Sequence, residues 1–168
     1  DESLNLEDHQ EIERKYVLWV GRSDLWKQPE MFITLAKSFP DIKFQMVCQP
    51  ANDQNRYLEL QQSAETLPNL TFLGAVSPQR INDLYREAML FVLTSISEGF
   101  ANTMMEAMSA SCAILTLGTD PDNIITGEKM GLVAKDYDEL CVFLDSLVSH
   151  PETMQKMGSN ARDFLLRE

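Results

Sequence analysis

The chain has 168 residues, the length expected of one domain with a single hydrophobic core. Its composition, with 44% hydrophobic and 24% charged residues, is typical of a folded globular protein and excludes a disordered or fibrous chain. The formal net charge of -12 disfavours nucleic acids and anionic lipid surfaces as partners, because they bind net basic surfaces, although a few well-placed cations can still hold a small anion.

The start of the chain differs from the rest. Residues 1–14 are polar and acidic and show almost no apolar period. We predict that residues 1–15 are a linker or a cut end, and that residues 16–168 form one domain, the C-terminal half of a longer protein. No stretch approaches the roughly 20 apolar residues of a membrane-spanning helix, so we expect a soluble domain.

From Tyr16 onward, short apolar runs alternate with segments of helical period, a pattern that predicts a parallel sheet covered by helices. The predicted strands are Tyr16–Val20, Lys43–Cys48, Leu70–Leu73, Leu90–Thr94, Ala113–Leu117 and Leu132–Ala134. The predicted helices begin at Pro29, after the N-cap candidates Asp53 and Ser77, at Asp138 and at Glu152. The expected fold is therefore an α/β domain with about six parallel strands and helices on both faces.

Four of the seven glycines stand at the ends of predicted strands. They are Gly21, Gly74, Gly99 and Gly118. Ligands of open parallel sheets bind at the carboxyl ends of the strands, where glycine allows tight turns and close approach of the backbone. These glycines mark that edge as the candidate site, although turns alone also require some of them.

The loop after the first predicted strand carries two cations, Arg22 and Lys27, just before a helix start. An arginine fork, a lysine point charge and a helix N-terminus together can hold a diphosphate. The alternative is that both are solvated charges paired with Asp24 or Glu30. The chain has neither a Walker-type phosphate loop nor a G-x-G-x-x-G dinucleotide motif.

A second cluster joins the fourth predicted strand to the following helix. Glu98 is expected in the loop and Glu106 about one turn into the helix, where two carboxylates suit sugar hydroxyls. The free amides of residues 101–103 could meet a phosphate or a hydroxyl at the helix start. The alternatives are a surface acid for Glu98 and a favourable interaction with the helix dipole for Glu106.

The metal-binding and redox side chains are sparse. Cys48, Cys112 and Cys141 are an odd set at wide spacings inside apolar segments, which indicates reduced thiols in a cytoplasmic protein. With two histidines and no cysteine pair at ligand spacing, no zinc site is expected. The Asp-x-Asp sequences at 120–122 and 136–138 are interpreted as turn chemistry rather than metal ligands.

These residues carry a family resemblance. They are Gly21, Arg22 and Lys27, then Phe72–Gly74, Ser97–Phe100, Glu106–Met108, Gly127 and Gly131–Val133. In this order they resemble the C-terminal, donor-binding half of the GT-B glycosyltransferases of family four, group 1 type. Glu98 and Glu106, with seven residues between them, match the family's E-x7-E element, which is the most specific signal.

The resemblance implies a three-layer Rossmann-like lobe and a role for each matched residue. Arg22 and Lys27 would grip the donor diphosphate as it leaves, Glu98 would bind the transferred sugar, and Glu106 would bind the ribose. Arg22, Lys27 and Glu98 are thus the implied catalytic residues. The implied donor-binding residues are Gly21, Arg22, Lys27, Ala75, Val76, Glu98, Gly99, Phe100, Ala101, Asn102, Thr103 and Glu106, with the backbone of Ala75 and Val76 bracketing the base.

The resemblance also implies a reaction. The full-length protein would be a hexosyltransferase that transfers a hexosyl group from a nucleotide diphosphate sugar to a glycan or lipid-linked acceptor in surface polysaccharide biosynthesis. Transfer would be retaining and metal-independent, with no cofactor besides the donor. The acceptor would bind through the missing N-terminal domain, so this chain alone is expected to be inactive. The full-length protein would be cytoplasmic and peripheral to the inner membrane, any membrane contact coming from its other parts.

Two other interpretations remain open. One is a noncatalytic nucleotide-sugar-binding or interaction module of the same fold, and the other is a flavodoxin-like regulatory or cofactor domain. Departures from the family pattern bear on the first of these. Gln28 stands where glycine commonly follows the lysine, Ala101 where glycine or proline is usual, Ser111 and Ala113 where glycine and proline are frequent, and Asn123 near a frequent acid.

Overall fold

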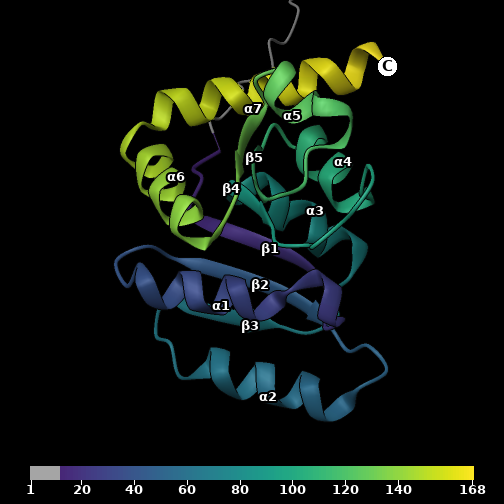
Figure 1. Cartoon of the computed structure of the whole chain (residues 1–168), viewed down its shortest axis with the longest axis vertical. Helices are drawn as coiled ribbons and strands as arrows, with labels where there is room; N and C mark the ends of the chain where they lie inside the picture. The colour runs from purple at the N-terminus through teal and green to yellow at the C-terminus, as the bar shows by residue number, and fades with distance from the viewer. Residues whose placement is uncertain (1–11) are drawn as a thin grey trace, which may run out of the picture.

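A computed structural model describes residues 12–168 (Figure 1), so the prediction of a linker over residues 1–11 lies outside the described residues. In this part of the chain, six strands form one sheet in the order β3-β2-β1-β4-β5-β6, with every neighbouring pair parallel. The strands are β1 (Tyr16–Arg22), β2 (Phe44–Gln49), β3 (Leu70–Leu73), β4 (Ala88–Leu93), β5 (Ala113–Leu117) and β6 (Gly131–Ala134). The predicted α/β class and parallel sheet are confirmed.

Helices connect the strands, as parallel pairing requires. They are α1 (Pro29–Ser38), α2 (Gln54–Glu65), α3 (Pro78–Glu87), α4 (Asn102–Ser109), α5 (Ile124–Gly127), α6 (Tyr137–Ser149) and α7 (Pro151–Arg167), with short 3-10 turns η1 (Leu25–Lys27) and η2 (Pro121–Asn123). Local signals start two of them as predicted. Asp53 accepts a hydrogen bond from the Arg56 amide at 3.0 Å, and Ser77 accepts one from the Arg80 amide at 3.2 Å.

The sheet separates two hydrophobic cores, because successive residues of a strand point to opposite faces. Val17 and Trp19 of β1 belong to the core formed with α1, α2 and α6, whereas Tyr16 and Leu18 belong to the core formed with α3, α4 and α5. The three layers of helix, sheet and helix confirm the Rossmann-like arrangement. They also leave the carboxyl ends of β1, β3, β4 and β5 free to carry loops.

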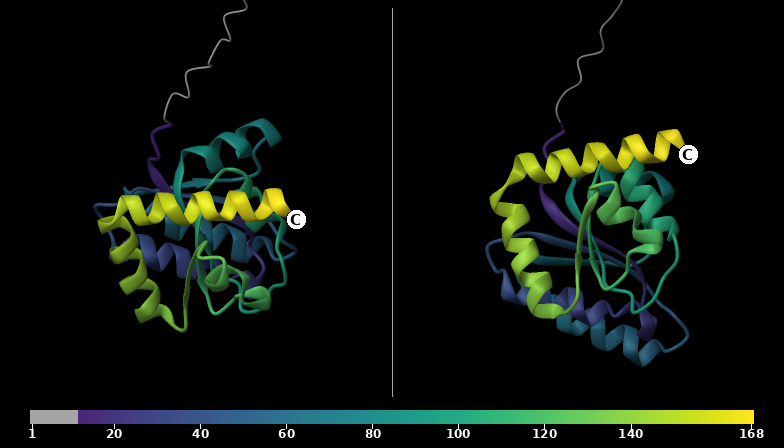
Figure 2. Two further views of the ribbon diagram at one scale, coloured as in Figure 1. Left: turned by 90° about the horizontal axis from the view of Figure 1, so that it is seen from above. Right: turned by 45° about the horizontal axis from the view of Figure 1, so that its top comes forward.

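Helix α7 crosses the start of β5 and takes part in both cores (Figure 2). Met154 packs in the first core and Ala161 in the second. The close approach depends on Gly158, because a Cβ atom there would lie 2.0 Å from the carbonyl oxygen of Ser111. This crossing closes the end of the sheet that lies opposite the candidate site.

The residues just before β1 are attached to the domain. The Arg14 guanidinium donates hydrogen bonds to the carbonyls of Ala88 at 2.8 Å and Ala110 at 2.7 Å. The Lys15 amide donates to the carbonyl of Glu87 at 2.7 Å. Arg14 and Lys15 therefore contact the domain although composition places them in the predicted linker, residues 1–15.

The cysteines are all free, and Cys48 and Cys112 are buried. The first aspartate of each Asp-x-Asp sequence bonds to groups close by in the chain, as the interpretation of turn chemistry expects. Asp120 accepts hydrogen bonds from the Ile125 amide and the Thr126 hydroxyl, and Asp136 caps α6 through the Glu139 amide. Among residues 12–168, no helix combines the length and the apolar character needed to cross a membrane.

Candidate functional site

An ion pair joins the loops that follow β1 and β4. The Lys27 ammonium lies 2.8 Å from Oε1 of Glu98, and the two side chains are only 13% and 12% exposed. The pair stands at the carboxyl edge of the sheet, where ligands of such folds bind. Two residues predicted as separate ligand contacts are thus in direct contact with each other.

The second carboxylate oxygen of Glu98 is also occupied. The Ser95 hydroxyl donates a hydrogen bond to Oε2 at 2.7 Å, and Ser95 itself is 1% exposed. The buried Thr119 hydroxyl in turn donates to the Ser95 carbonyl at 3.1 Å. One carboxylate oxygen of Glu98 is therefore held by the Ser95 hydroxyl and the other by the Lys27 ammonium.

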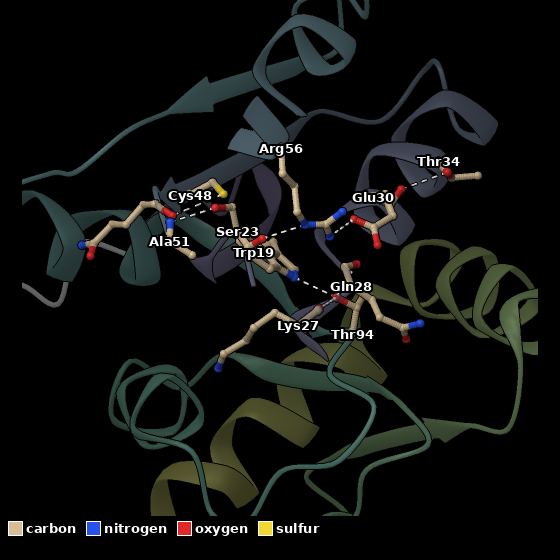
Figure 3. Close-up of polar contacts among 11 residues, drawn as sticks. Trp19, Ser23, Lys27, Gln28, Glu30, Thr34, Cys48, Ala51, Arg56 and Thr94 are labelled. Atoms are coloured by element: carbon tan, nitrogen blue, oxygen red, sulfur yellow. Dashed lines mark hydrogen bonds and ion pairs between the residues drawn. The ribbon is translucent and has the colours of Figure 1, made fainter. Parts of the chain in front are cut away.

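Thr94 ties the backbone of the lysine loop to the end of β4 (Figure 3). Its hydroxyl accepts a hydrogen bond from the Trp19 indole at 2.9 Å and donates to the carbonyls of Lys27 at 2.6 Å and Gln28 at 3.0 Å. A further bond runs from the Ile96 amide to the Trp26 carbonyl at 2.9 Å. The loops that carry Lys27 and Glu98 are thereby fixed to each other.

Gln28 adopts the left-handed backbone conformation, with φ of 48°. This conformation favours glycine, which explains why glycine is usual at this position in the resembled family. Directly after Gln28, the chain turns into α1 with Pro29 at its first position.

An exposed indole borders the ion pair. The Lys27 ammonium lies 4.4 Å from the ring centroid of Trp26, which is within the range of a cation–π contact. Trp26 is 44% exposed, and Leu25 and Ile96 beside it are more exposed still. Sequence reasoning did not single out Trp26, although an aromatic residue next to the proposed phosphate lysine was a visible signal.

Arg22 does not join this cluster. Its guanidinium lies 3.4 Å from the Asp24 carboxylate, and its side chain is 53% exposed. The alternative interpretation, in which Arg22 is a solvated charge paired with Asp24 or Glu30, predicted such a pair. Glu30, the other acid considered there, pairs instead with Arg56 at 2.6 Å (Figure 3).

The start of α4 offers polar groups to the same edge. Its N-cap residue, Ala101, supplies no side-chain hydrogen bond. The first amides of a helix have no partner within the helix, so those of Asn102 and Thr103 point out from its N-terminus. The Thr103 hydroxyl is buried and has no hydrogen-bond partner within the described residues. This end of α4 therefore presents unpaired backbone amides, with an unpaired hydroxyl buried behind them.

Glu106 lies farther along α4, on its exposed side facing α3. It lines a hollow of about 490 Å³ together with Asn82, Tyr85 and Arg86 of α3. Burial, and next the negative charge of Glu106, raise the pKa of the Tyr85 hydroxyl. Among residues 12–168, no hydrogen bond or ion pair joins Glu106 to Glu98 or Lys27.

The remaining predicted residues occupy neighbouring loops. Ala75 is exposed and Val76 half-buried in the loop between β3 and α3, and Gly99 is exposed beside Glu98. Gly21 sits against Trp19, whose ring would lie 2.9 Å from a Cβ atom at position 21. Packing alone thus explains this glycine. Phe100 contacts Phe164 of α7 with ring centroids 6.4 Å apart.

Two residues of this site escaped the sequence analysis, Thr94 and Ser95. Both stand at the end of a predicted apolar strand, where buried hydroxyl groups need partners. The spacing of Ser95 three residues before Glu98 is the signal that could have found the contact. No group of three or more potential metal-ligating side chains occurs within residues 12–168.

The chain matches one family model and several known enzymes over most of its length. The family model described as "Glycosyl transferases group 1" matches residues 4–164. The alpha-galactosylglucosyldiacylglycerol synthase of Streptococcus pneumoniae is 34% identical over 125 residues, which cover 73% of this chain and 32% of the synthase. The trehalose synthase of Thermococcus litoralis is 27% identical over 164 residues, 90% of this chain and 40% of that enzyme. The chain therefore spans about a third to two-fifths of these relatives.

Solved structures share the fold. The C-terminal domain of a glycosyl transferase group 1 family protein from Francisella tularensis superposes with a TM-score of 0.78 at 24% identity, covering 94% of this chain and 87% of that one. The Anabaena protein HepE, solved in complex with UDP, superposes with a TM-score of 0.79 at 20% identity, covering 92% of this chain and 44% of that one. At these identities the likeness shows the fold.

Proposed function

Because this chain belongs to the group 1 glycosyl transferases, we propose that it is the lobe that binds the nucleotide diphosphate sugar donor. The observation that carries the proposal is the contact between Lys27 and Glu98 at the carboxyl edge of the sheet. A cation suited to phosphate and an acid suited to sugar hydroxyls stand side by side there. In a nucleotide diphosphate sugar, the sugar is bonded directly to the diphosphate, so neighbouring side chains can contact both groups.

The diphosphate would lie between Lys27 and the start of α4. The helix N-terminus offers amide donors and the positive end of the helix dipole, and the Thr103 hydroxyl lacks a partner within the described residues. Arg22 would join by leaving Asp24, which costs little because this ion pair is exposed. Both cations would then stabilise the charge of the departing diphosphate.

The remaining parts of the donor are assigned from the matched positions. Glu98 would accept hydroxyls of the transferred sugar, and Glu106 would accept the ribose hydroxyls from its exposed position on α4. The backbone of Ala75 and Val76, in the loop after β3, would bracket the base. The roles of Glu106, Ala75 and Val76 rest on the family motif and not on a contact with Lys27 or Glu98.

The proposed reaction is retaining, metal-independent transfer of a hexosyl group to a glycan or lipid-linked acceptor, in surface polysaccharide biosynthesis. The acceptor would be held by a second lobe, since the chain spans 32% and 40% of the two relatives described above. The full-length enzyme would work in the cytoplasm, at the membrane that carries its acceptor. The cations and the helix N-terminus support metal independence, because they place positive charge where a divalent ion would otherwise act.

A binding experiment tests the donor-binding role. Calorimetry with UDP-, GDP- and ADP-sugars should identify a donor, and Lys27→Ala should weaken the binding of the matching nucleoside diphosphate by about 1.5 to 3 kcal/mol, the scale of a hydrogen bond to a charged group. Binding of the nucleoside should change little. Lys156→Ala, an exposed lysine of α7, is the matched control. Equal losses for nucleotide and nucleoside would place Lys27 away from the phosphates.

A transfer assay separates a catalyst from a binding module. The full-length protein should transfer sugar from the donor with retention of anomeric configuration, and a chelator should leave the rate unchanged. The chain alone should bind the donor and not transfer it. Donor binding without transfer in the full-length protein, across glycan and lipid-linked acceptors, would favour the noncatalytic module.

A further inference from the structure

The two side chains that the proposed function assigns to different parts of the donor bind each other. Lys27, proposed for the diphosphate, and Glu98, proposed for the sugar, are 2.8 Å apart and almost entirely buried. Each is the other's counterion. A ligand that engages one of them therefore changes the surroundings of the other.

A bare diphosphate has an unfavourable effect on Glu98. If the phosphate draws the ammonium of Lys27 away, a buried carboxylate loses its cation, and if the ammonium stays between them, two anions come close together. Either outcome makes phosphate binding less favourable than it would be at a lysine without a partner. The pair thus opposes a ligand that offers only phosphate.

An intact sugar donor reverses this effect. Hydroxyls of the sugar can donate hydrogen bonds to the Glu98 oxygen released by Lys27, so that the buried carboxylate stays satisfied. Ser95 matters here because its hydroxyl holds the other oxygen, Oε2, at 2.7 Å. The carboxylate therefore keeps its orientation while Oε1 changes partner.

We propose that the Lys27–Glu98 ion pair makes the site select the intact sugar donor over the bare nucleoside diphosphate, and that Ser95 is the positioning residue for this selection. The inference rests on the proposed function and adds discrimination between substrate and product. Arg22 does not take part, because its partner Asp24 belongs to a separate, exposed pair.

The test compares two ligands in one titration series. Calorimetry measures the dissociation constants of the sugar donor and of its nucleoside diphosphate, with inorganic pyrophosphate as a probe that lacks the base. In Glu98→Gln, pyrophosphate and the nucleoside diphosphate should bind about threefold to tenfold more tightly than in the unaltered chain. The sugar donor should bind more weakly, so the selectivity ratio should fall.

Two further variants sharpen the result. Ser95→Ala keeps the ion pair, so it should leave pyrophosphate binding unchanged while lowering the affinity for the sugar donor. A purely structural role of Ser95 would lower the melting temperature without changing the selectivity ratio. Glu128→Gln is the matched control, because Glu128 forms an ion pair of the same length, 2.8 Å, with Arg167 on the exposed surface.

The outcomes distinguish the inference from the proposed function. If the unaltered chain binds a sugar donor but Glu98→Gln binds pyrophosphate no more tightly, the inference fails and the function stands. If the unaltered chain binds none of the nucleoside diphosphates or their sugars, both fail together. Should Glu98→Gln not fold, Glu98→Ala decides, because it also removes the carboxylate that opposes phosphate and should likewise tighten pyrophosphate binding.

Discussion

Contacts hold both the backbone and the side-chain ammonium of Lys27. Its carbonyl accepts a hydrogen bond from Thr94 at 2.6 Å, and its ammonium contacts both the Glu98 carboxylate and the Trp26 ring. A free lysine side chain carries up to about 2 kcal/mol of rotamer entropy. Because these contacts restrict the side chain during folding, less of that entropy remains to be lost when a ligand binds.

Thr94→Val tests the hydrogen bonds that hold the backbone of Lys27 and Gln28. Valine keeps the shape of the side chain but removes the hydroxyl, which leaves the Trp19 indole and the carbonyl of Lys27 without their partner. We expect a loss of about 1 to 3 kcal/mol in the free energy of unfolding, measured by urea denaturation. The same substitution at the exposed Thr71 of β3 should be neutral or slightly stabilising. Equal effects at both positions would contradict this role of Thr94.

At the scale of elements, helix ends use residues with an unusual backbone conformation. Helix α4 ends at Ser109, and Ser111, just beyond its C-cap Ala110, has φ of 56°. The amides of Ser111 and Cys112 donate back to the carbonyls of Met108 and Ala107. This is the hydrogen-bond pattern that normally places glycine in the left-handed position. Glycine is also frequent at this position of the resembled family, so the local geometry accounts for one of the departures.

Ser111→Gly should therefore stabilise the domain. The left-handed conformation costs a residue other than glycine about 1 to 2 kcal/mol, and the greater freedom of glycine in the unfolded chain offsets about half of the gain. A rise of about 0.5 to 1 kcal/mol in the free energy of unfolding is expected in urea denaturation. Ser109→Gly, two residues earlier inside α4, should lower it. Destabilisation by both would show that the backbone at position 111 carries no strain.

The packing of α7 on β5 gives a second prediction for an element. Gly158→Ala places a Cβ atom 2.0 Å from the Ser111 carbonyl oxygen, so the helix has to move away from the sheet. We expect a loss of at least about 2 kcal/mol of stability, as in other overpacked contacts. Gly127→Ala is the matched control, because the added carbon meets no atom of another part of the chain within 4 Å. A melting temperature unchanged by Gly158→Ala would refute the close contact.

The elements were predictable where their signals are local. The caps at Asp53 and Ser77 and the apolar runs identified the helix starts and strands, because each depends on residues a few positions apart. The pairing of charges was not predictable from such local signals. Arg56, from the start of α2, pairs with Glu30, and Lys27 pairs with Glu98, 71 positions away in the sequence. Only the strand order brings these groups together.

At the scale of the whole molecule, buried ionisable groups make stability depend on pH. Burial raises the pKa of the Cys48 and Cys112 thiols from 9.0 to about 12, and burial also raises the pKa of Tyr16. Between about pH 9 and pH 12 the unfolded chain releases thiol protons that the folded chain keeps. The folded state then binds more protons than the unfolded state, so its stability falls as the pH rises.

Urea denaturation at pH 8 and pH 10 should show this fall in the free energy of unfolding. The double variant Cys48→Ala/Cys112→Ala should show a smaller fall between the same two pH values, even though its stability at pH 8 is lower because two buried side chains are shortened. The remaining dependence would come from groups such as Tyr16. Identical slopes for the unaltered chain and the double variant would show that the thiols do not contribute.

Helix α7 touches both cores, through Met154 on one side of the sheet and Ala161 on the other. Neither layer can therefore open at this end without disturbing the same helix. Amide protons in the strands on which α7 lies should consequently exchange with solvent by global unfolding rather than by opening of a single layer. By joining the helical layers on the two faces of the sheet, α7 thus makes them unfold as one cooperative unit.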